Sequence, residues 1–211
     1  MSVAERLVIA VVGRKGGAGK TTTAFNLAGV LAEKGAPVTL FDLDPQQSLS
    51  RLMEGRAPWG ATVLPLGPAA ASQDGRQVAP WLGSLLDREH GYVVIDTPPQ
   101  LGAIIEAAIA RADRVVIPTR LAQQDIDSLL DTLTLCPAGA LIVPNLYANR
   151  RTLHRAAVAA LRESYGDEVA KKEIPDSAVI EEALNAGAPV VRFSRRSAPA
   201  VAYRALAAEV A

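Results

Sequence analysis

The sequence has little of several features that mark particular classes of protein. Cys136 is the only cysteine, so no intramolecular disulfide bond can form, and a cytoplasmic location is expected. Lysine plus arginine and aspartate plus glutamate number 22 each, so no net charge attracts nucleic acid or an anionic membrane. Aromatic residues are only 4% of the chain, which leaves few platforms for base stacking. Any nucleic-acid contact must come from a local basic patch.

Long hydrophobic runs are also missing. The apolar stretch at residues 7–12 is too short to span a bilayer, and no small-residue cleavage site follows a basic start. We therefore expect neither export nor membrane insertion. With 211 residues, of which 49% are hydrophobic, the chain can bury a substantial core, and we expect a single domain over residues 1–211.

Short β-branched runs alternate with longer stretches of helical periodicity. Each run is continuously apolar over about 4 to 6 residues, as in parallel strands buried on both faces. The expected strands are 7–12, 37–44, 92–96, 114–119 and 140–145. The expected helices between them are 21–35, 104–112, 123–135 and 151–166. This alternation predicts an α/β fold, a mostly parallel twisted sheet with helices on both faces.

Two regions are less regular. Residues 57–77 are rich in proline, glycine and alanine, and we expect one strand at 62–66 and a surface loop. From Lys171 to Arg196 the sequence predicts a short strand, a helix at 177–187, a second strand at 189–193 and a basic turn. The last helix is expected at 198–210.

The segment GRKGGAGKTT, residues 13–22, follows the first expected strand and opens the first expected helix. This arrangement binds phosphate, because backbone N–H groups wrap the anion, Lys20 reaches the outer phosphates and the Thr21 hydroxyl ligates Mg²⁺. The general pattern has glycine where this chain has Arg14. The expected nucleotide-binding residues of the loop are Gly16, Gly17, Ala18, Gly19, Lys20, Thr21 and Thr22.

Lys15 to Thr21 resembles the deviant phosphate loop K-G-G-x-G-K-S/T of the ParA/MinD family of P-loop ATPases. That resemblance implies that Lys15 crosses the interface of an ATP-bound homodimer and touches the nucleotide of the other subunit. A lysine at this position cannot easily fold back onto phosphates that its own loop encloses. Two nucleotides held face to face would supply concentrated negative charge for it.

Carboxylates end two of the expected strands. Asp42 and Asp44 end the second, and Asp96 ends the fourth, so they lie in the crevice where open α/β sheets bind ligands. Asp96 is the candidate Mg²⁺ ligand through a bound water, together with Thr21. Asp44 is better placed to orient an attacking water. Asp42 either braces this metal site or caps the following helix.

The resemblance to ParA proteins extends over residues 7–210. DLDPQ and DTPP are similar to the two switch segments of that family, which implies hydrolysis through Asp44, alongside Lys15 and Lys20, and Mg²⁺ binding through Asp96. Asn145 and the loop from Pro175 through Asp176 to Ser177 would then lie against adenine. Where this chain has Pro175-Asp176-Ser177, ParA proteins commonly have Pro-Arg-Asn. The helix-turn-helix extension of the larger plasmid members is not present, so we expect no operator binding.

Arginines gather at two places. Arg192, Arg195 and Arg196 precede the last helix. The resemblance to ParA proteins implies nonspecific DNA binding through the region that matches Arg195 and Arg196. We take these three as the candidate DNA-binding residues. Arg150, Arg151 and Arg155 form the other group and are as readily structural. Solvated arginines that pair with helix ends are the alternative for each of them.

The resemblance thus implies a ParA-type partition ATPase that uses ATP/ADP and Mg²⁺. ATP would drive homodimer formation and nonspecific DNA binding, and a ParB-like centromere-binding partner would stimulate hydrolysis. No membrane anchor is expected, since the final segment AVAYRALAAEVA has a single arginine and ends acidic. Two alternatives stay open: a ParA-like ATPase that positions a non-DNA cargo, and an ATP-dependent small-molecule enzyme resembling dethiobiotin synthetase. One cysteine excludes an electron carrier that holds a cluster between subunits.

Overall fold

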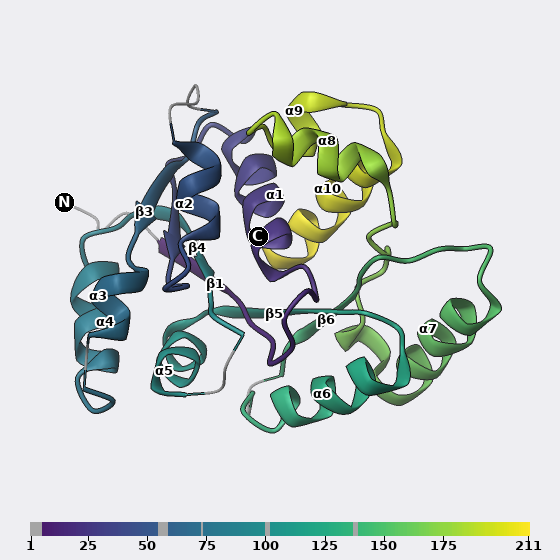
Figure 1. Ribbon diagram of the computed structural model, residues 1–211, viewed down its shortest axis with the longest axis horizontal. Helices are drawn as coiled ribbons and strands as arrows, with labels where there is room; N and C mark the ends of the chain where they lie inside the picture. The colour runs from purple at the N-terminus through teal and green to yellow at the C-terminus, as the bar shows by residue number, and fades with distance from the viewer. Residues whose placement is uncertain (1–5, 55–58, 73, 100–101, 137–138) are drawn as a thin grey trace.

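The computed structural model describes residues 6–54, 59–72, 74–99, 102–136 and 139–211, and in these ranges six strands form one sheet. The strands run in the order β3-β2-β4-β1-β5-β6, and every pair of neighbours is parallel (Figure 1). Their bounds are β1 Arg6–Val11, β2 Val38–Asp42, β3 Thr62–Pro65, β4 Gly91–Asp96, β5 Arg114–Thr119 and β6 Leu141–Pro144. The parallel α/β sheet predicted from the sequence is confirmed.

The helices fill the connections between the strands. They are α1 Lys20–Ala32, α2 Ser48–Met53, α3 Gly67–Ala71, α4 Val78–Leu86, α5 Ala103–Arg111, α6 Gln123–Leu133, α7 Thr152–Tyr165, α8 Ala178–Asn185, α9 Val190–Phe193 and α10 Ala198–Val210, with a 3₁₀ turn at Gly166–Glu168. Within the described ranges, no helix is long and apolar enough to cross a membrane.

Side chains of each strand point alternately into two separate cores, which is why the strands read as continuous apolar runs. Ile9 and Val11 of β1 face α1, α2 and α8 to α10, whereas Val8 and Ala10 face α3 to α7. Figure 1 shows α1 and α8 to α10 on one side of the sheet and α5 to α7 on the other. Helices therefore cover both faces.

The register of the three central strands aligns their carboxyl ends. Val11 pairs with Asp96, and Asp96 pairs with Asp42, so β1, β4 and β2 end at the same level. The loop after β1 and the aspartates after β2 and β4 therefore meet at one edge of the sheet. This alignment positions the candidate site.

The strand predicted at 189–193 is wrong. Val190–Phe193 forms α9, in which Val190 and Val191 are fully buried against α1 in the helical layer. The Val190 N–H donates to Asn26 Oδ1 at 2.7 Å, so its backbone is satisfied without a neighbouring strand. β-branched residues favour strands because they suit buried, pleated surfaces, and here a helix layer supplies the burial.

The short strand expected after Lys171 does not form either. The described residues beside β6 show two isolated bridges, Ile142 with Val169 and Tyr147 with Pro175. The strand in the 57–77 region is present as β3, but α3 begins where a loop was expected, and α4 was not predicted. Pro80 and Gly83 weaken the helical pattern of α4, although proline is tolerated in a first turn.

Gly29 lies where α1 packs on the residue before α9. A Cβ at Gly29 would stand 2.2 Å from the Pro189 Cβ, a contact that forces backbone to move. We expect Gly29→Ala to lower the free energy of unfolding by about 1–3 kcal/mol, although alanine favours helices. In the control Gly83→Ala, the new Cβ meets only the guanidinium end of Arg111, a flexible side chain that moves aside. Urea unfolding should show that control within about 1 kcal/mol of wild type; equal behaviour of the two variants would contradict the packing argument.

Candidate functional site

The loop between β1 and α1 curls at the carboxyl edge of the sheet. Gly17 and Gly19 have φ angles of 73° and 92°, which favour glycine. A Cβ on Gly19 would lie 2.1 Å from the Asn145 Nδ2, so a side chain there would push Asn145 away. The loop leads directly into the first turn of α1, whose free N–H groups favour an anion.

Asn145 braces the loop from the end of β6. It is buried, its Nδ2 donates to the Ala18 carbonyl at 2.7 Å, and its Oδ1 accepts from the Leu146 N–H at 2.9 Å. The expected adenine contact of Asn145 stays a prediction. What the structure adds is that its carboxamide holds the phosphate loop in shape.

Lys20 points into the loop that precedes it. Its side chain is 7% exposed, and its Nζ donates to the Lys15 carbonyl at 3.1 Å. Burial lowers the pKa of this ammonium, and the carboxylates of Asp96 and Asp44 partly oppose that shift. Lys20 therefore occupies the centre of the loop, where bound phosphate oxygens would replace a backbone carbonyl as its partner.

Asp96 is a buried carboxyl group whose loss of water is not balanced by hydrogen bonds from the described residues. It is 1% exposed, and neither oxygen accepts a well-aligned hydrogen bond from the described residues. Burial raises its pKa to about 7, helped by the neighbouring charges of Asp42 and Asp44, while Thr21 and Lys20 act in the opposite direction. Two free carboxylate oxygens beside the Thr21 hydroxyl are a donor set that suits Mg²⁺.

Asp42 has its oxygens engaged by the chain itself. Oδ2 accepts from the Ser50 N–H at 2.9 Å and the Ser50 hydroxyl at 2.8 Å, and Oδ1 accepts from the Asp44 N–H at 3.3 Å. Ser50 is the third residue of α2, so these contacts are those of the helix-capping alternative. Magnesium binding by Asp42 stays a prediction.

Asp44 lies at the mouth of the site and is half-buried. Its Oδ1 accepts from the Gln46 N–H at 2.9 Å, an arrangement that fixes the turn after β2. Asp44 lines the cavity above the loop. Its hydrolytic role stays a prediction.

A cavity of about 650 Å³ lies over the loop and extends toward α8, a size suited to a nucleotide. Predicted residues that line it are Gly16, Gly17, Gly19, Lys20, Thr21, Thr22, Asp44, Asn145 and Asp176. The cavity is also lined by four residues that were not predicted, Leu146, Ile180, Glu181 and Leu184. Pro175 does not line the cavity but pairs with Tyr147 beside it.

Lys15 is turned away from this cavity. Its Nζ lies 2.6 Å from the Asp125 Oδ1 in the first turn of α6. Asp125 was missed by sequence reasoning, which considered carboxylates after β2 and β4 but not the one that follows β5. An acidic residue near the carboxyl end of another central strand was the signal available.

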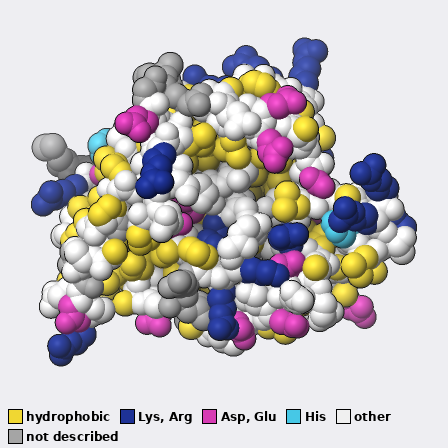
Figure 2. Space-filling model, in the orientation of Figure 1, with side chains coloured by type: hydrophobic (Ala, Val, Ile, Leu, Met, Phe, Trp, Pro, Cys, Tyr) yellow, Lys and Arg dark blue, Asp and Glu magenta, His cyan; other side chains and the backbone are white. Residues whose placement is uncertain are grey.

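The candidate DNA-binding arginines lie apart from the cavity, around the turn between α9 and α10. Arg192, Arg195 and Arg196 are exposed, and none of them forms an ion pair within the described part of the chain. Figure 2 shows acidic and basic side chains interspersed over this side of the molecule, with a second group of basic side chains over α7. Arg150, Arg151 and Arg155, at the start of α7, are exposed.

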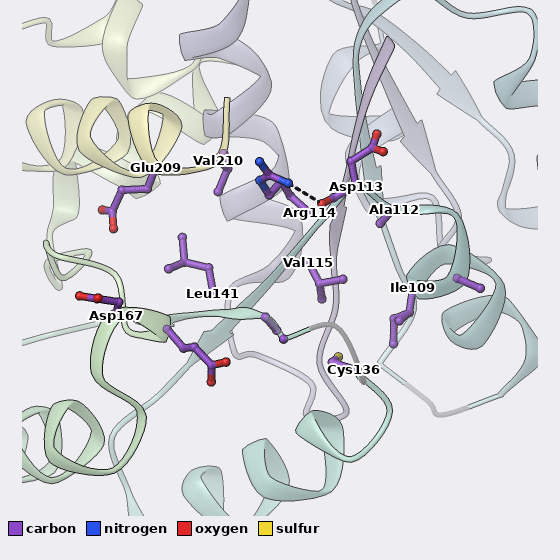
Figure 3. Close-up of a pocket in the computed structure, with 14 residues that line it drawn as sticks. Ile109, Ala112, Asp113, Arg114, Val115, Cys136, Leu141, Asp167, Glu209 and Val210 are labelled. Carbon is purple, nitrogen blue, oxygen red and sulfur yellow. Dashed lines mark hydrogen bonds between the residues drawn. The ribbon is translucent and has the colours of Figure 1, made fainter. Parts of the chain in front are cut away.

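A second cavity, of about 490 Å³, lies at the opposite edge of the sheet (Figure 3). Arg114 and Leu141, which line it, are the first residues of β5 and β6, and carboxylates of Asp113, Asp167 and Glu209 surround it. Ligands of open α/β sheets bind at the carboxyl ends of the strands. The cavity over the glycine-rich loop is therefore the candidate nucleotide site.

Comparison with known proteins agrees with that geometry. A sequence profile described as the CobQ/CobB/MinD/ParA nucleotide binding domain matches residues 9–190. The chain belongs to this family. The resemblance to ParA and MinD proteins inferred from the loop is confirmed, and the chain is a ParA/Soj/MinD-like ATPase by family.

Curated relatives and solved structures cover nearly the whole chain. The chromosome-partitioning ATPase Soj of Thermus thermophilus is 33% identical over 96% of this chain and 94% of its own length. The ATP complex of a McdA variant from Cyanothece has a TM-score of 0.81 at 22% identity, covering 98% and 96% of the two chains. Cobyrinic acid a,c-diamide synthase from Mycobacterium smegmatis, with a bound ATP analogue and magnesium, has a TM-score of 0.74 at 26% identity, covering 97% and 93%.

The raised pKa of Asp96 predicts a pH-dependent stability. Between pH 3.8 and about 7 the folded protein keeps a proton that the unfolded chain has lost, so the stability that Asp96 contributes falls as the pH rises through this window. Without nucleotide and Mg²⁺, we expect Asp96→Asn to be more stable than wild type by about 2–4 kcal/mol at pH 8, and by less towards pH 4.

Urea unfolding at pH 4.5, 6 and 8 in the presence of a chelator would measure this difference. Asp127→Asn, which removes an exposed carboxylate, is the control and should follow wild type at each pH. A stability gap for Asp96→Asn that does not change with pH would contradict the assignment.

Proposed function

We propose that this protein is a ParA-type partition ATPase. In this proposal ATP joins two subunits into a dimer, and the dimer binds DNA without sequence preference. A ParB-like centromere-binding partner then stimulates hydrolysis and releases the DNA, so that cycles of binding and release segregate plasmid or chromosome DNA. The near full-length similarity to the chromosome-partitioning ATPase Soj supports it.

The position of Lys15 is the observation that carries the proposal. Lys20 and the loop glycines line the cavity of their own subunit, whereas the Lys15 side chain points at α6 and is 35% exposed. A loop that needs one lysine for its own phosphates has a second one on its outer side. Charge-assisted contacts from that lysine to phosphates of another subunit would favour the dimer, because ATP shifts the equilibrium only through contacts made in the dimer.

The other site residues fit this scheme. Gly16 to Thr22 would enclose the phosphates, and Thr21 together with Asp96 would hold Mg²⁺, which neutralises phosphate charge. The free oxygens of Asp96 and the glycine cradle at Gly19 support that fit. Asp44 would orient the attacking water from the mouth of the cavity.

Two alternatives keep specific support. The fold is shared with McdA, so a ParA-like ATPase that positions another cargo is the first. A cavity of about 420 Å³ beside the nucleotide site supports the second, a small-molecule enzyme, since Asp44 and Pro99 line both cavities. ATP hydrolysis that depends strictly on a small molecule would favour the enzyme. Slow ATP hydrolysis without a small molecule would favour a positioning or partition ATPase.

DNA binding tests the proposal most directly. We expect wild type to bind nonspecific duplex DNA with ATP and Mg²⁺ but not with ADP or without nucleotide, and to bind more weakly at higher salt. Arg195→Ala/Arg196→Ala should lose roughly tenfold or more in affinity, because a dimer carries the patch twice. Arg150→Ala/Arg151→Ala is the matched control and should retain binding.

Fluorescence anisotropy at two salt concentrations would measure the affinities. No binding by wild type under any condition would exclude the DNA-partition role and leave the two alternatives.

Substitutions of the two loop lysines should separate ATP binding from dimerisation. We expect Lys20→Ala to lose ATP binding itself, because it removes the ammonium that faces the phosphates. Lys15→Ala should keep ATP affinity within about twofold but lose ATP-dependent dimers and hydrolysis. Calorimetry for ATP affinity and light scattering for mass would check both. A normal ATP-dependent dimer of Lys15→Ala would remove Lys15 from the interface.

A further inference from the structure

The leading half of the phosphate loop is tied to α6 by two ion pairs. Lys15 Nζ lies 2.6 Å from Asp125 Oδ1, and the Arg14 guanidinium contacts the Asp131 carboxylate six residues further along the helix. The Arg14 N–H also approaches the Thr132 hydroxyl at 3.4 Å. The Arg14 pair is half-exposed and contributes little to stability, so the Lys15 pair is the one that fixes the loop.

Asp125 is an unusual partner because it is buried. Its side chain is 4% exposed, and Oδ1 accepts no well-aligned hydrogen bond from the described residues, so the Lys15 ammonium compensates it by charge. The N-terminal turn of α6 adds a favourable field. If Lys15 left, the buried carboxylate would keep only the distant Arg120 Nε, 4.0 Å from its Oδ2, and a poorly paired buried charge is unfavourable.

Arg120 is the cation that could replace Lys15. It lies in the connection between β5 and α6, its side chain is 49% exposed, and its Nε stands 4.0 Å from Asp125 Oδ2. This distance is the outer limit of an ion pair. A small rotation of the arginine side chain would bring its guanidinium fully onto the carboxylate.

Lys15 has a second anchor that a nucleotide would release. The Lys15 carbonyl accepts the hydrogen bond from Lys20 Nζ at 3.1 Å. Phosphate oxygens in the loop would compete for that ammonium, because a charge-assisted bond to an anion is stronger than one to a neutral carbonyl. Binding of ATP would thus remove the backbone anchor and leave only the Asp125 ion pair.

We propose that Asp125 is a positioning residue that holds Lys15 against α6 in the free subunit and exchanges it for Arg120 when a second, nucleotide-loaded subunit offers its phosphates. This inference rests on the proposed function, since it assumes that Lys15 serves the other subunit. The exchange keeps the buried carboxylate paired in both states. The exchange also sets a threshold for dimerisation, because the partner's phosphates must attract Lys15 more strongly than Asp125 does.

Dimerisation of variants tests the exchange. With ATP and Mg²⁺, Asp125→Asn frees Lys15, and we expect the protein concentration for half-dimerisation to fall about tenfold, within the usual range of coupling between sites. Arg120→Ala removes the replacement cation and should raise that concentration severalfold. Asp127→Asn removes an exposed carboxylate from the same helix and should match wild type. Analytical ultracentrifugation over a protein dilution series would measure all four proteins.

Lysine acetylation of the nucleotide-free protein tests the held state without any nucleotide. An ammonium in an ion pair must leave it and lose a proton before it reacts. We expect Lys15 to be acetylated several times faster in Asp125→Asn than in wild type. Mass spectrometry would measure this rate, with the exposed Lys172 as the internal reference. Thermal unfolding would confirm that the variant is folded. If it is not, Arg120→Ala, a surface change, carries the dimerisation test.

The outcomes separate the two proposals. A wild type that never dimerises with ATP would remove the proposed function, while Lys15 reactivity would still decide the held state. A wild type that dimerises normally, with Asp125→Asn and Arg120→Ala both unchanged in dimerisation, would overturn the exchange and leave the proposed function intact. Equal Lys15 reactivity in wild type and Asp125→Asn would overturn the held state.

Discussion

The burial of Lys20 and Asp96 at the same end of the sheet is the constraint on which the site depends. Both groups are almost fully shielded from water, and both carry pKa shifts that oppose their charged forms. A chain maintains such groups at the expense of its own stability. Phosphates and a cation would compensate both groups, so their burial favours ligand binding.

The rest of the site supports those two residues. The aligned ends of β1, β4 and β2 bring the loop and the aspartates to one level, and Asn145 clamps the loop through the Ala18 carbonyl. Asp42 holds α2 in place through Ser50, which fixes the turn that carries Asp44. Each brace comes from a different strand, so the geometry of the loop depends on the whole sheet.

Helix α6 gives the loop a contact that a phosphate site by itself does not need. Asp125 compensates Lys15 on the outer side of the loop while Lys20 serves the inner side. The two lysines are five residues apart but face different surroundings, one lined by the nucleotide cavity and one by a helix. In the proposed function, this division would let one loop contact its own nucleotide and the nucleotide of a second subunit.

The sequence by itself determined the parallel α/β sheet, the phosphate loop and the family, because buried strands and a glycine-rich loop before a helix are local patterns that few other arrangements satisfy. Tertiary structure decided the remainder. The segment 189–193 contains helix α9 because it packs on α1 and not on a strand. Asp125, the partner of Lys15, lies 110 residues away on α6. Burial and pairing between distant segments are set by how layers pack, and no local pattern encodes that.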